Sequence, residues 1–292
     1  MHRFDYYTPA TVAEAVDLLR SKGAGGKIFA GGTDLMPAMK ERGRHPSYVV
    51  SLKNITDLKG IAFDASSGLR IKAGTRMSAI HKDATVQQHY PVIVQGAKLI
   101  GSLQTQNLAT IGGNVCNAAP SADAVPAFVV LDATATVQGP GGTRSLPITE
   151  VFKGPGQTSL AADEIMTELQ VPAPLPRSAG YYLRHVPRKE LDIAIAGVGV
   201  YVQLDEALQK ITHARVCLCA VAPVPMRATG AEAALVGQPA TADTIAKAAT
   251  AAAADARPIS DQRGSADFRR LLVNALTVKT LTAALDMIRA GR

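Results

Sequence analysis

Two glycine-containing segments carry residue types that could bind a phosphate group. They are "AGGTD" at residues 30–34, the first glycine loop, and "TIGGN" at residues 110–114, the second glycine loop. Because glycine lacks a Cβ, consecutive backbone N–H groups can turn toward one point and form an anion-binding nest, to which a following helix N-terminus adds positive charge. Thr33, Thr110 and Asn114 add short hydrogen-bond donors. We therefore expect the two loops to close on one diphosphate, although either loop alone could be a tight turn.

The commonest nucleotide-binding and hydrolase motifs are absent. A Rossmann GxGxxG fails because Ile28 stands where a third glycine would have to follow Gly23 and Gly25, and no GxxxxGK followed by Ser or Thr occurs. There is no GxSxG elbow or HExxH, and the six histidines lack metal-ligand spacing. We predict neither a catalytic side-chain constellation nor a metal site in this chain.

Composition indicates a soluble globular protein. The 292 residues are 47% hydrophobic, which allows a large core and two domains. There is no signal-peptide core and no long uninterrupted apolar run, so we expect a cytoplasmic protein without a membrane span. The formal net charge is +7, but Lys and Arg are scattered and Trp is absent. Nucleic-acid binding is therefore a weaker interpretation than an anionic cofactor or an acidic partner.

The elements that must position the loops follow an α+β pattern. Residues 1–55 predict a small βαβ-like unit, with Thr11 and Glu14 in capping-box spacing at the start of its first helix. Residues 56–175 alternate strand-like segments such as "GLRIKAG" with helices at about 77–83 and 92–100. Together these segments would place the two glycine loops in different parts of the N-terminal half.

A proline-rich stretch, "VPAPLPRSAG" at residues 171–180, marks a boundary. Beyond it, residues 192–228 predict two long antiparallel strands about a turn, and helices follow at about 245–254 and 266–288. We expect an N-terminal domain of residues 1–175, with subdomains of about 1–55 and 56–175. A C-terminal domain of antiparallel sheet and helices would cover residues 176–292.

Several segments, taken together, resemble one protein family. They are "AGGTDL", "TIGGNVCNAAPSAD", "DEIMTELQVP", "YYLRHVPRKELDIAIAGVGV" and the C-terminal "ADFRRLLVNALTVKTLTAAL". The chain resembles the FAD-binding medium subunit of molybdenum hydroxylases, a group that includes flavoprotein subunits of aerobic carbon monoxide dehydrogenase and quinoline oxidoreductase and the flavin domain of xanthine dehydrogenase. The resemblance implies a two-subdomain FAD-binding fold of the vanillyl-alcohol oxidase-like, PCMH type, followed by a smaller C-terminal domain.

The resemblance also implies where FAD would lie. The cofactor would extend between the two N-terminal subdomains, with its pyrophosphate held by both glycine loops. The implied FAD contacts are Ile28, Phe29, Ala30, Gly31, Gly32, Thr33, Asp34, Leu35, Ile100, Gly101, Thr110, Gly113, Asn114, Asp123, Met166, Arg184 and Ile193.

Individual positions carry specific expectations from the resemblance. Asp123 would accept hydrogen bonds from a hydroxyl-rich part of FAD, or it could cap a helix within "SADAVPAF". Ile100 and Gly101 would lie beside the isoalloxazine, where an aliphatic side chain covers the ring. Arg184 stands where relatives often carry Lys and would keep a positive charge near the flavin.

The resemblance implies FAD contacts at two further positions. Met166 matches an apolar position near the adenine end of FAD, and an ordinary core position is the alternative. Ile193, in "ELDIA" beside Asp192, matches a segment that faces the flavin.

The implied function is electron transfer through FAD. Three cysteines cannot supply the four thiolates of an iron–sulfur cluster, and no Cys-rich insertion interrupts "NAAPSADAVPAF", so clusters would lie in another chain. The family picture is a small subunit with two 2Fe-2S clusters, a large molybdenum-cofactor subunit and this flavoprotein, assembled as a dimer of heterotrimers that reduces an external acceptor. The alternatives are a stand-alone FAD-dependent oxidoreductase of the same fold and a basic nucleic-acid-binding scaffold.

Overall fold

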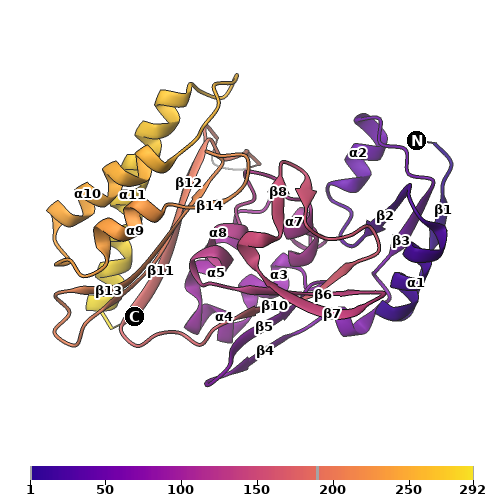
Figure 1. Ribbon diagram of the computed structural model, residues 1–292, viewed down its shortest axis with the longest axis horizontal. Coiled ribbons are helices and arrows are strands. Elements are labelled where there is room, and N and C mark those ends of the chain that lie inside the picture. The colour runs from indigo at the N-terminus through magenta and orange to yellow at the C-terminus, as the bar shows by residue number, and fades with distance from the viewer. Residues whose placement is uncertain (1, 189–190, 292) are drawn as a thin grey trace.

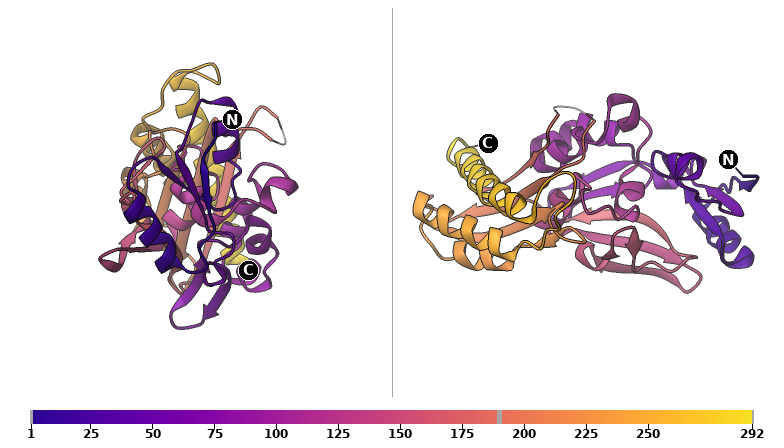
Figure 2. Two further views of the ribbon diagram at one scale, coloured as in Figure 1. Left: turned by 90° about the vertical axis from the view of Figure 1, so that its right-hand side faces the viewer. Right: turned by 90° about the horizontal axis from the view of Figure 1, so that it is seen from above.

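Among the described residues, three β-sheets of three or more strands follow one another along the longest axis of the molecule, in the order of the chain (Figure 1). The computed structural model describes residues 2–188 and 191–291. Figure 2 shows the N-terminal and C-terminal parts at opposite ends, with the middle sheet and its helices between them. Helices and strands are interspersed throughout, so the predicted α+β class is confirmed.

The N-terminal sheet is parallel, with the strand order β1-β3-β2. Its elements are β1 (Asp5–Tyr7), α1 (Val12–Lys22), β2 (Gly26–Phe29), α2 (Leu35–Glu41) and β3 (Tyr48–Ser51). Thr11 Oγ1 accepts from Glu14 N at 3.1 Å, which starts α1 at the predicted residue. The expected βαβ-like unit is confirmed, and β2 leads into the first glycine loop at its carboxyl end.

The middle sheet is antiparallel, with the order β4-β5-β10-β6-β7. Its strands are β4 (Ile61–Asp64), β5 (Gly68–Lys72), β6 (Thr134–Gly139), β7 (Gly142–Pro147) and β10 (Ile165–Val171). The accompanying elements are η1 (Thr56–Leu58), α3 (Met77–Lys82), α4 (Ala84–His89), α5 (Pro91–Lys98), α6 (Leu103–Gln106), α7 (Ile111–Cys116), α8 (Val125–Val130), η2 (Ile148–Glu150), β8 (Phe152–Gly154) and β9 (Gln157–Thr158). The two helices predicted in this part correspond to α3 and α5. Leu69, Ile71, Ile93 and Phe128 are among the fully buried residues of the core between sheet and helices.

The C-terminal sheet is antiparallel and is covered on both faces. Its strands, in spatial order, are β11 (Ser178–His185), β12 (Ala196–Leu204), β13 (Ile211–Cys219) and β14 (Met226–Arg227). α9 (Thr229–Leu235), α10 (Ala242–Asp255) and α11 (Ala266–Arg289) pack on one side, and α5 and α8 of the middle part contact the strands as well. The two predicted long strands are β12 and β13, and nearly every residue of β12 is buried because both faces are covered.

The last helix, α11, has the length and composition of a membrane span. In the structure it packs against β11, β12 and α10, and Val273, Leu281 and Leu285 belong to the C-terminal core. Within the described residues, α11 is therefore a core helix with one face packed on the sheet and its neighbours, while Phe268, Leu271 and Val278 are exposed.

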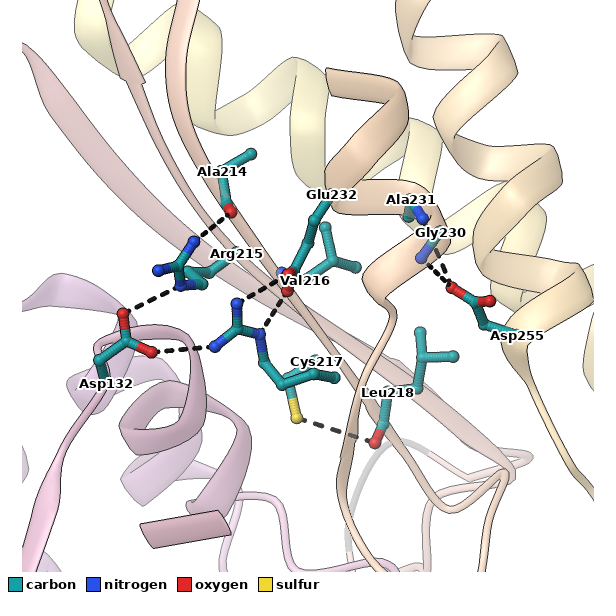
Figure 3. A network of polar contacts seen from close by, with 11 residues as sticks. Asp132, Ala214, Arg215, Val216, Cys217, Leu218, Gly230, Ala231, Glu232 and Asp255 are labelled. Atoms are coloured by element: carbon teal, nitrogen blue, oxygen red, sulfur yellow. Dashed lines mark hydrogen bonds and ion pairs between the residues drawn. The ribbon is translucent and has the colours of Figure 1, made fainter. Parts of the chain in front are cut away.

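A charge network joins the middle part to the C-terminal sheet (Figure 3). Asp132, which follows α8, accepts from Arg215 of β13 and from Arg227 of β14, each at 2.9 Å. Arg227 also forms a two-pronged pair with Glu232 of α9, with one contact at 2.7 Å, and Glu232 Oε1 accepts from Val216 N at 2.9 Å. The network fixes the register between α8, β13, β14 and α9.

Replacement of the buried acid in this network should destabilise the protein. Glu232→Gln keeps an acceptor for Val216 N but loses the charge that Arg227 faces, so we expect a loss of about 2 kcal/mol in the free energy of unfolding. Asp267→Asn is the matched control, because Asp267 is 93% exposed in its pair with Arg270, and a change near zero is expected. Urea unfolding followed by circular dichroism measures the free energy of unfolding of both variants. Equal losses in the two would contradict a stabilising role for Glu232 in the network.

Candidate functional site

The first glycine loop packs against the residues that lead directly into the second, although the two loops are far apart in the sequence. A Cβ on Gly31 would lie 2.3 Å from the carbonyl oxygen of Leu108 and 2.9 Å from Ala109 Cα, so the absence of a side chain lets the two backbones meet. A Cβ on Gly113 would lie 3.8 Å from Ala30 Cβ. The two loops therefore lie close together, and their closure on one diphosphate stays a prediction. The first loop leads from β2 into α2, and the second leads into α7.

The first glycine loop leaves a run of backbone donors without protein acceptors. Among the described residues, no backbone acceptor pairs with the N–H groups of residues 31–35, and the first bonded N–H is that of Met36, which donates to Gly32 O at 3.0 Å. Gly32 has a φ of +78°, a left-handed conformation that glycine adopts readily. The Asp34 side chain makes no capping bond at the start of α2. These donors are available to an anionic ligand.

The second glycine loop is different, and the prediction of an amide nest there is wrong. The N–H groups of residues 111–114 bond to the protein: Ile111 to Thr75 O, Gly112 to Ala73 O, Gly113 to Thr110 Oγ1 and Asn114 to Thr110 O. Gly112 is needed for packing, because a Cβ there would lie 2.9 Å from Ala73 O. Thr110 caps α7. The loop therefore offers side chains to a ligand in place of amide hydrogens.

Asn114 is the clearest of these side chains. Its Oδ1 is buried and has no hydrogen-bond partner among the described residues. A buried polar atom without a partner is uncommon in a folded protein and needs an explanation. Because Asn114 lines the same cavity as the first loop, a bound polar ligand would satisfy its amide.

Asn114→Ala tests whether the side chain serves a ligand. In the FAD-free chain the free energy of unfolding should change by less than about 0.5 kcal/mol, since no partner is lost. FAD affinity should fall by about tenfold to a hundredfold, the equivalent of one hydrogen bond to a charged group. Urea unfolding and fluorescence titration measure the two effects. Asn54→Ala, at an exposed turn, is the control, and unchanged FAD affinity of Asn114→Ala would contradict the role.

One cavity of about 730 Å³ opens between the two loops. All residues predicted to contact FAD line this cavity, with the exception of Phe29. The Phe29 ring instead packs over Gly32, where a Cβ would lie 2.3 Å from it, and Lys53 Nζ lies 4.6 Å from its centroid. Met166 of β10 lines the cavity and is also part of the middle core, so the core interpretation holds and the position near the adenine end of FAD stays a prediction.

A buried ion pair lies in the cavity wall. Arg184 Nη1 donates to Asp123 Oδ2 and, at 3.2 Å, to the carbonyl of Asp192. Tyr182 donates from its hydroxyl to Asp123 Oδ1 at 2.7 Å. Burial raises the pKa of Asp123 to about 6, although Arg184 and Tyr182 each act to lower it. The helix-cap alternative for Asp123 is wrong, because α8 begins after Ala124 without a side-chain cap.

Tyr182 is the residue of this site that the sequence did not identify. It lies two positions before Arg184 on β11, and the two-residue period of a strand places both side chains on one face. A strand assigned to "YYLRH" predicts that Tyr182 and Arg184 lie on the same face. The contact to Asp123 spans 59 positions in the chain and has no local signal.

The three cysteines are protonated thiols, of which Cys217 and Cys219 are buried and Cys116 is partly buried. Burial raises the pKa of Cys116, which lines the cavity, to about 12, and it raises the pKa of Cys217 and Cys219 as well. Within residues 2–188 and 191–291, no group of three or more His, Cys, Asp or Glu side chains is placed to hold a metal ion. Thiols of this kind are poor metal ligands because the thiolate is the binding form.

Comparison with known families decides the assignment. The family described as "FAD binding domain in molybdopterin dehydrogenase" matches residues 2–174, more than half of the chain. The chain belongs to this family. The "CO dehydrogenase flavoprotein C-terminal domain" matches residues 181–284 of this flavoprotein. The resemblance found in the sequence is thereby confirmed, and FAD is the family's cofactor.

Individual relatives of this flavoprotein are similar over almost their entire length. The carbon monoxide dehydrogenase medium chain of Hydrogenophaga pseudoflava is 33% identical over 97% of each chain. The xanthine dehydrogenase FAD-binding subunit of Escherichia coli O157:H7 is 30% identical over 96% of this chain and 95% of the relative. The solved structure of carbon monoxide dehydrogenase from Hydrogenophaga pseudoflava superposes with a TM-score of 0.93, at 34% identity and 97% coverage of both chains. These likenesses confirm the two-part fold and show that the chain is an oxidoreductase subunit.

Proposed function

We propose that this flavoprotein binds FAD in the cavity between the glycine loops and passes electrons through it within a molybdenum hydroxylase complex. The observation that carries the proposal is the run of N–H groups at residues 31–35, which have no acceptor among the described residues, in a cavity wall shared with Asn114, whose Oδ1 has no described partner either. The diphosphate of FAD would supply acceptors for the first group, and a hydroxyl group of the same cofactor could donate to Asn114 Oδ1. The residues present therefore fit FAD.

Different predicted contact residues would hold different parts of the cofactor. The first loop would hold the pyrophosphate through N–H groups, and the second would close the cavity through Thr110, Gly113 and Asn114. Asp123 and Arg184 would present a carboxylate and a cation beside Ile100, Gly101 and Ile193 near the flavin, with Met166 toward the adenine. Bound FAD supplies one- and two-electron chemistry, and the chain orients it and excludes water.

We further propose the organisation of the chain and of its complex. Residues 1–175 would form the FAD-binding domain, with subdomains of about 1–55 and 56–175, and residues 176–292 the C-terminal domain. A small subunit with two 2Fe-2S clusters and a large molybdenum-cofactor subunit would complete a cytoplasmic dimer of heterotrimers. The buried, protonated thiols of this chain support clusters held elsewhere.

Purification of the full chain tests the cofactor. We expect a yellow protein with the visible absorbance bands of a flavin, which releases FAD rather than FMN on denaturation. A colourless protein that stays colourless after incubation with FAD would contradict the proposal. Affinity purification from the native host should recover chains that contain iron–sulfur clusters and molybdenum. Substrate turnover by the lone chain would instead support the stand-alone oxidoreductase.

A further inference from the structure

A carboxyl group in the cavity wall is poised to change its protonation near neutral pH. Asp123 and Arg184 have side chains that are each 7% exposed, and both line the proposed FAD cavity. Tyr182 is 2% exposed and holds Asp123 Oδ1. Burial raises the pKa of Asp123 from its ordinary value to about 6, even with a cation and a hydroxyl bound to it.

The charges of Asp123 and Arg184 bear on the reduction of a bound flavin. With Asp123 ionised, its charge and that of Arg184 cancel. Two-electron reduction of a flavin with uptake of one proton adds a negative charge to the isoalloxazine, which lies in the same cavity under the proposed function. A buried site resists a change of net charge because an uncompensated charge is costly there. Protonation of Asp123 would return the summed charge of Asp123, Arg184 and the reduced flavin to zero.

We propose that Asp123 takes up one proton from solvent when the bound flavin accepts two electrons, so that the freed charge of Arg184 compensates the reduced flavin. The inference rests on the proposed function, in which partner iron–sulfur clusters supply the two electrons. One proton goes to the flavin and one to Asp123, and both leave when the external acceptor removes the electrons. Tyr182 acts as a positioning residue that holds the carboxyl group through its hydroxyl.

The other groups around Asp123 do not compete for this role. Cys219, at the end of β13, is a buried thiol whose pKa is raised, so it stays neutral. Burial likewise raises the pKa of Tyr182 well above its ordinary value. On the α5 side, Gly96 packs against the Asp123 carbonyl and has no side chain. The Asp192 carboxylate is engaged by Arg188 and by Ile193 N, outside this contact.

The test compares wild-type protein with Asp123→Asn, each as the full chain reconstituted with FAD. The midpoint potential of the flavin is measured by spectroelectrochemistry as a function of pH, and its slope gives the protons taken up per two electrons. Above about pH 6 the wild-type protein should take up one proton more per flavin than the variant. Below that pH the difference should vanish, because Asp123 is already protonated before reduction. Protons that titrate on the flavin itself cancel in this comparison.

Two further measurements keep the proposal falsifiable if Asp123→Asn fails to fold or to bind FAD. Infrared difference spectra of the wild-type protein should gain the C=O stretch of a protonated carboxylic acid on reduction above pH 6. Tyr182→Phe removes a donor to the carboxylate, so the extra proton uptake should begin at a higher pH. No carboxylic acid band, or equal slopes at every pH, would overturn the inference alone. A wild-type chain that binds no FAD would contradict the proposed function and the inference with it.

Discussion

Gly31→Ala is expected to lower FAD affinity by up to about a hundredfold and to destabilise the FAD-free chain. The new Cβ would lie 2.3 Å from the Leu108 carbonyl oxygen. The atoms it meets belong to the backbone, so no side chain can rotate away and the loops must separate. Overpacking of this kind costs about 1–3 kcal/mol, and 3 kcal/mol corresponds to roughly a hundredfold in binding. Fluorescence titration with FAD and urea unfolding measure the two losses.

The backbone conformation at Gly31 lets this test isolate one contact. Gly31 is not among the residues with positive φ, so alanine is allowed there and only the contact between loops is disturbed. Gly32→Ala would be harder to interpret, because φ is +78° at Gly32. Gly141→Ala is the control, since a Cβ there meets no atom within 4 Å and φ is not positive. Normal FAD occupancy in Gly31→Ala would show that the loops can part without loss of the site.

The convergence of the two loops could be predicted because the evidence for it is local. Paired glycines, short donors and flanking apolar segments lie within five residues at each loop, and the family resemblance joins them. The periodicity of the apolar residues likewise places α1, α10, α11, β12 and β13 near their observed bounds. These features depend on backbone conformation and patterning within short windows.

The use of each donor could not be predicted, because it depends on distant parts of the chain. The N–H groups of Ile111 and Gly112 are satisfied by Thr75 and Ala73, which lie just after β5. The sheet register that brings them together is set by long-range packing. Asp132 meets Arg215 and Arg227 across 83 and 95 positions for the same reason. The sequence shows which residues can bond, and the topology decides which of them do.

Loss of the cation in the cavity wall should also have a large effect, and the effect should depend on pH. Arg184→Ala leaves Asp123 buried without a counter-charge, so we expect the free energy of unfolding at pH 8 to fall by about 3–5 kcal/mol. The pKa of Asp123 is already raised to about 6, above its value in an unfolded chain. Proton binding at Asp123 therefore stabilises the fold at low pH, and this contribution is lost as pH rises through 6.

The difference in the free energy of unfolding between wild-type protein and Arg184→Ala should accordingly grow from pH 5 to pH 8. In the variant an ionised Asp123 has no counter-charge, and this destabilisation arises only where Asp123 is deprotonated. Urea unfolding of the FAD-free proteins at several pH values measures it. Arg184→Lys should recover much of the stability, since it keeps the charge but not the planar geometry of the guanidinium. The double variant Asp123→Asn/Arg184→Ala should lose less than Arg184→Ala at pH 8. Arg20→Ala, at an exposed pair, controls for surface charge, and a pH-independent loss in Arg184→Ala would mean that packing, not charge, explains it.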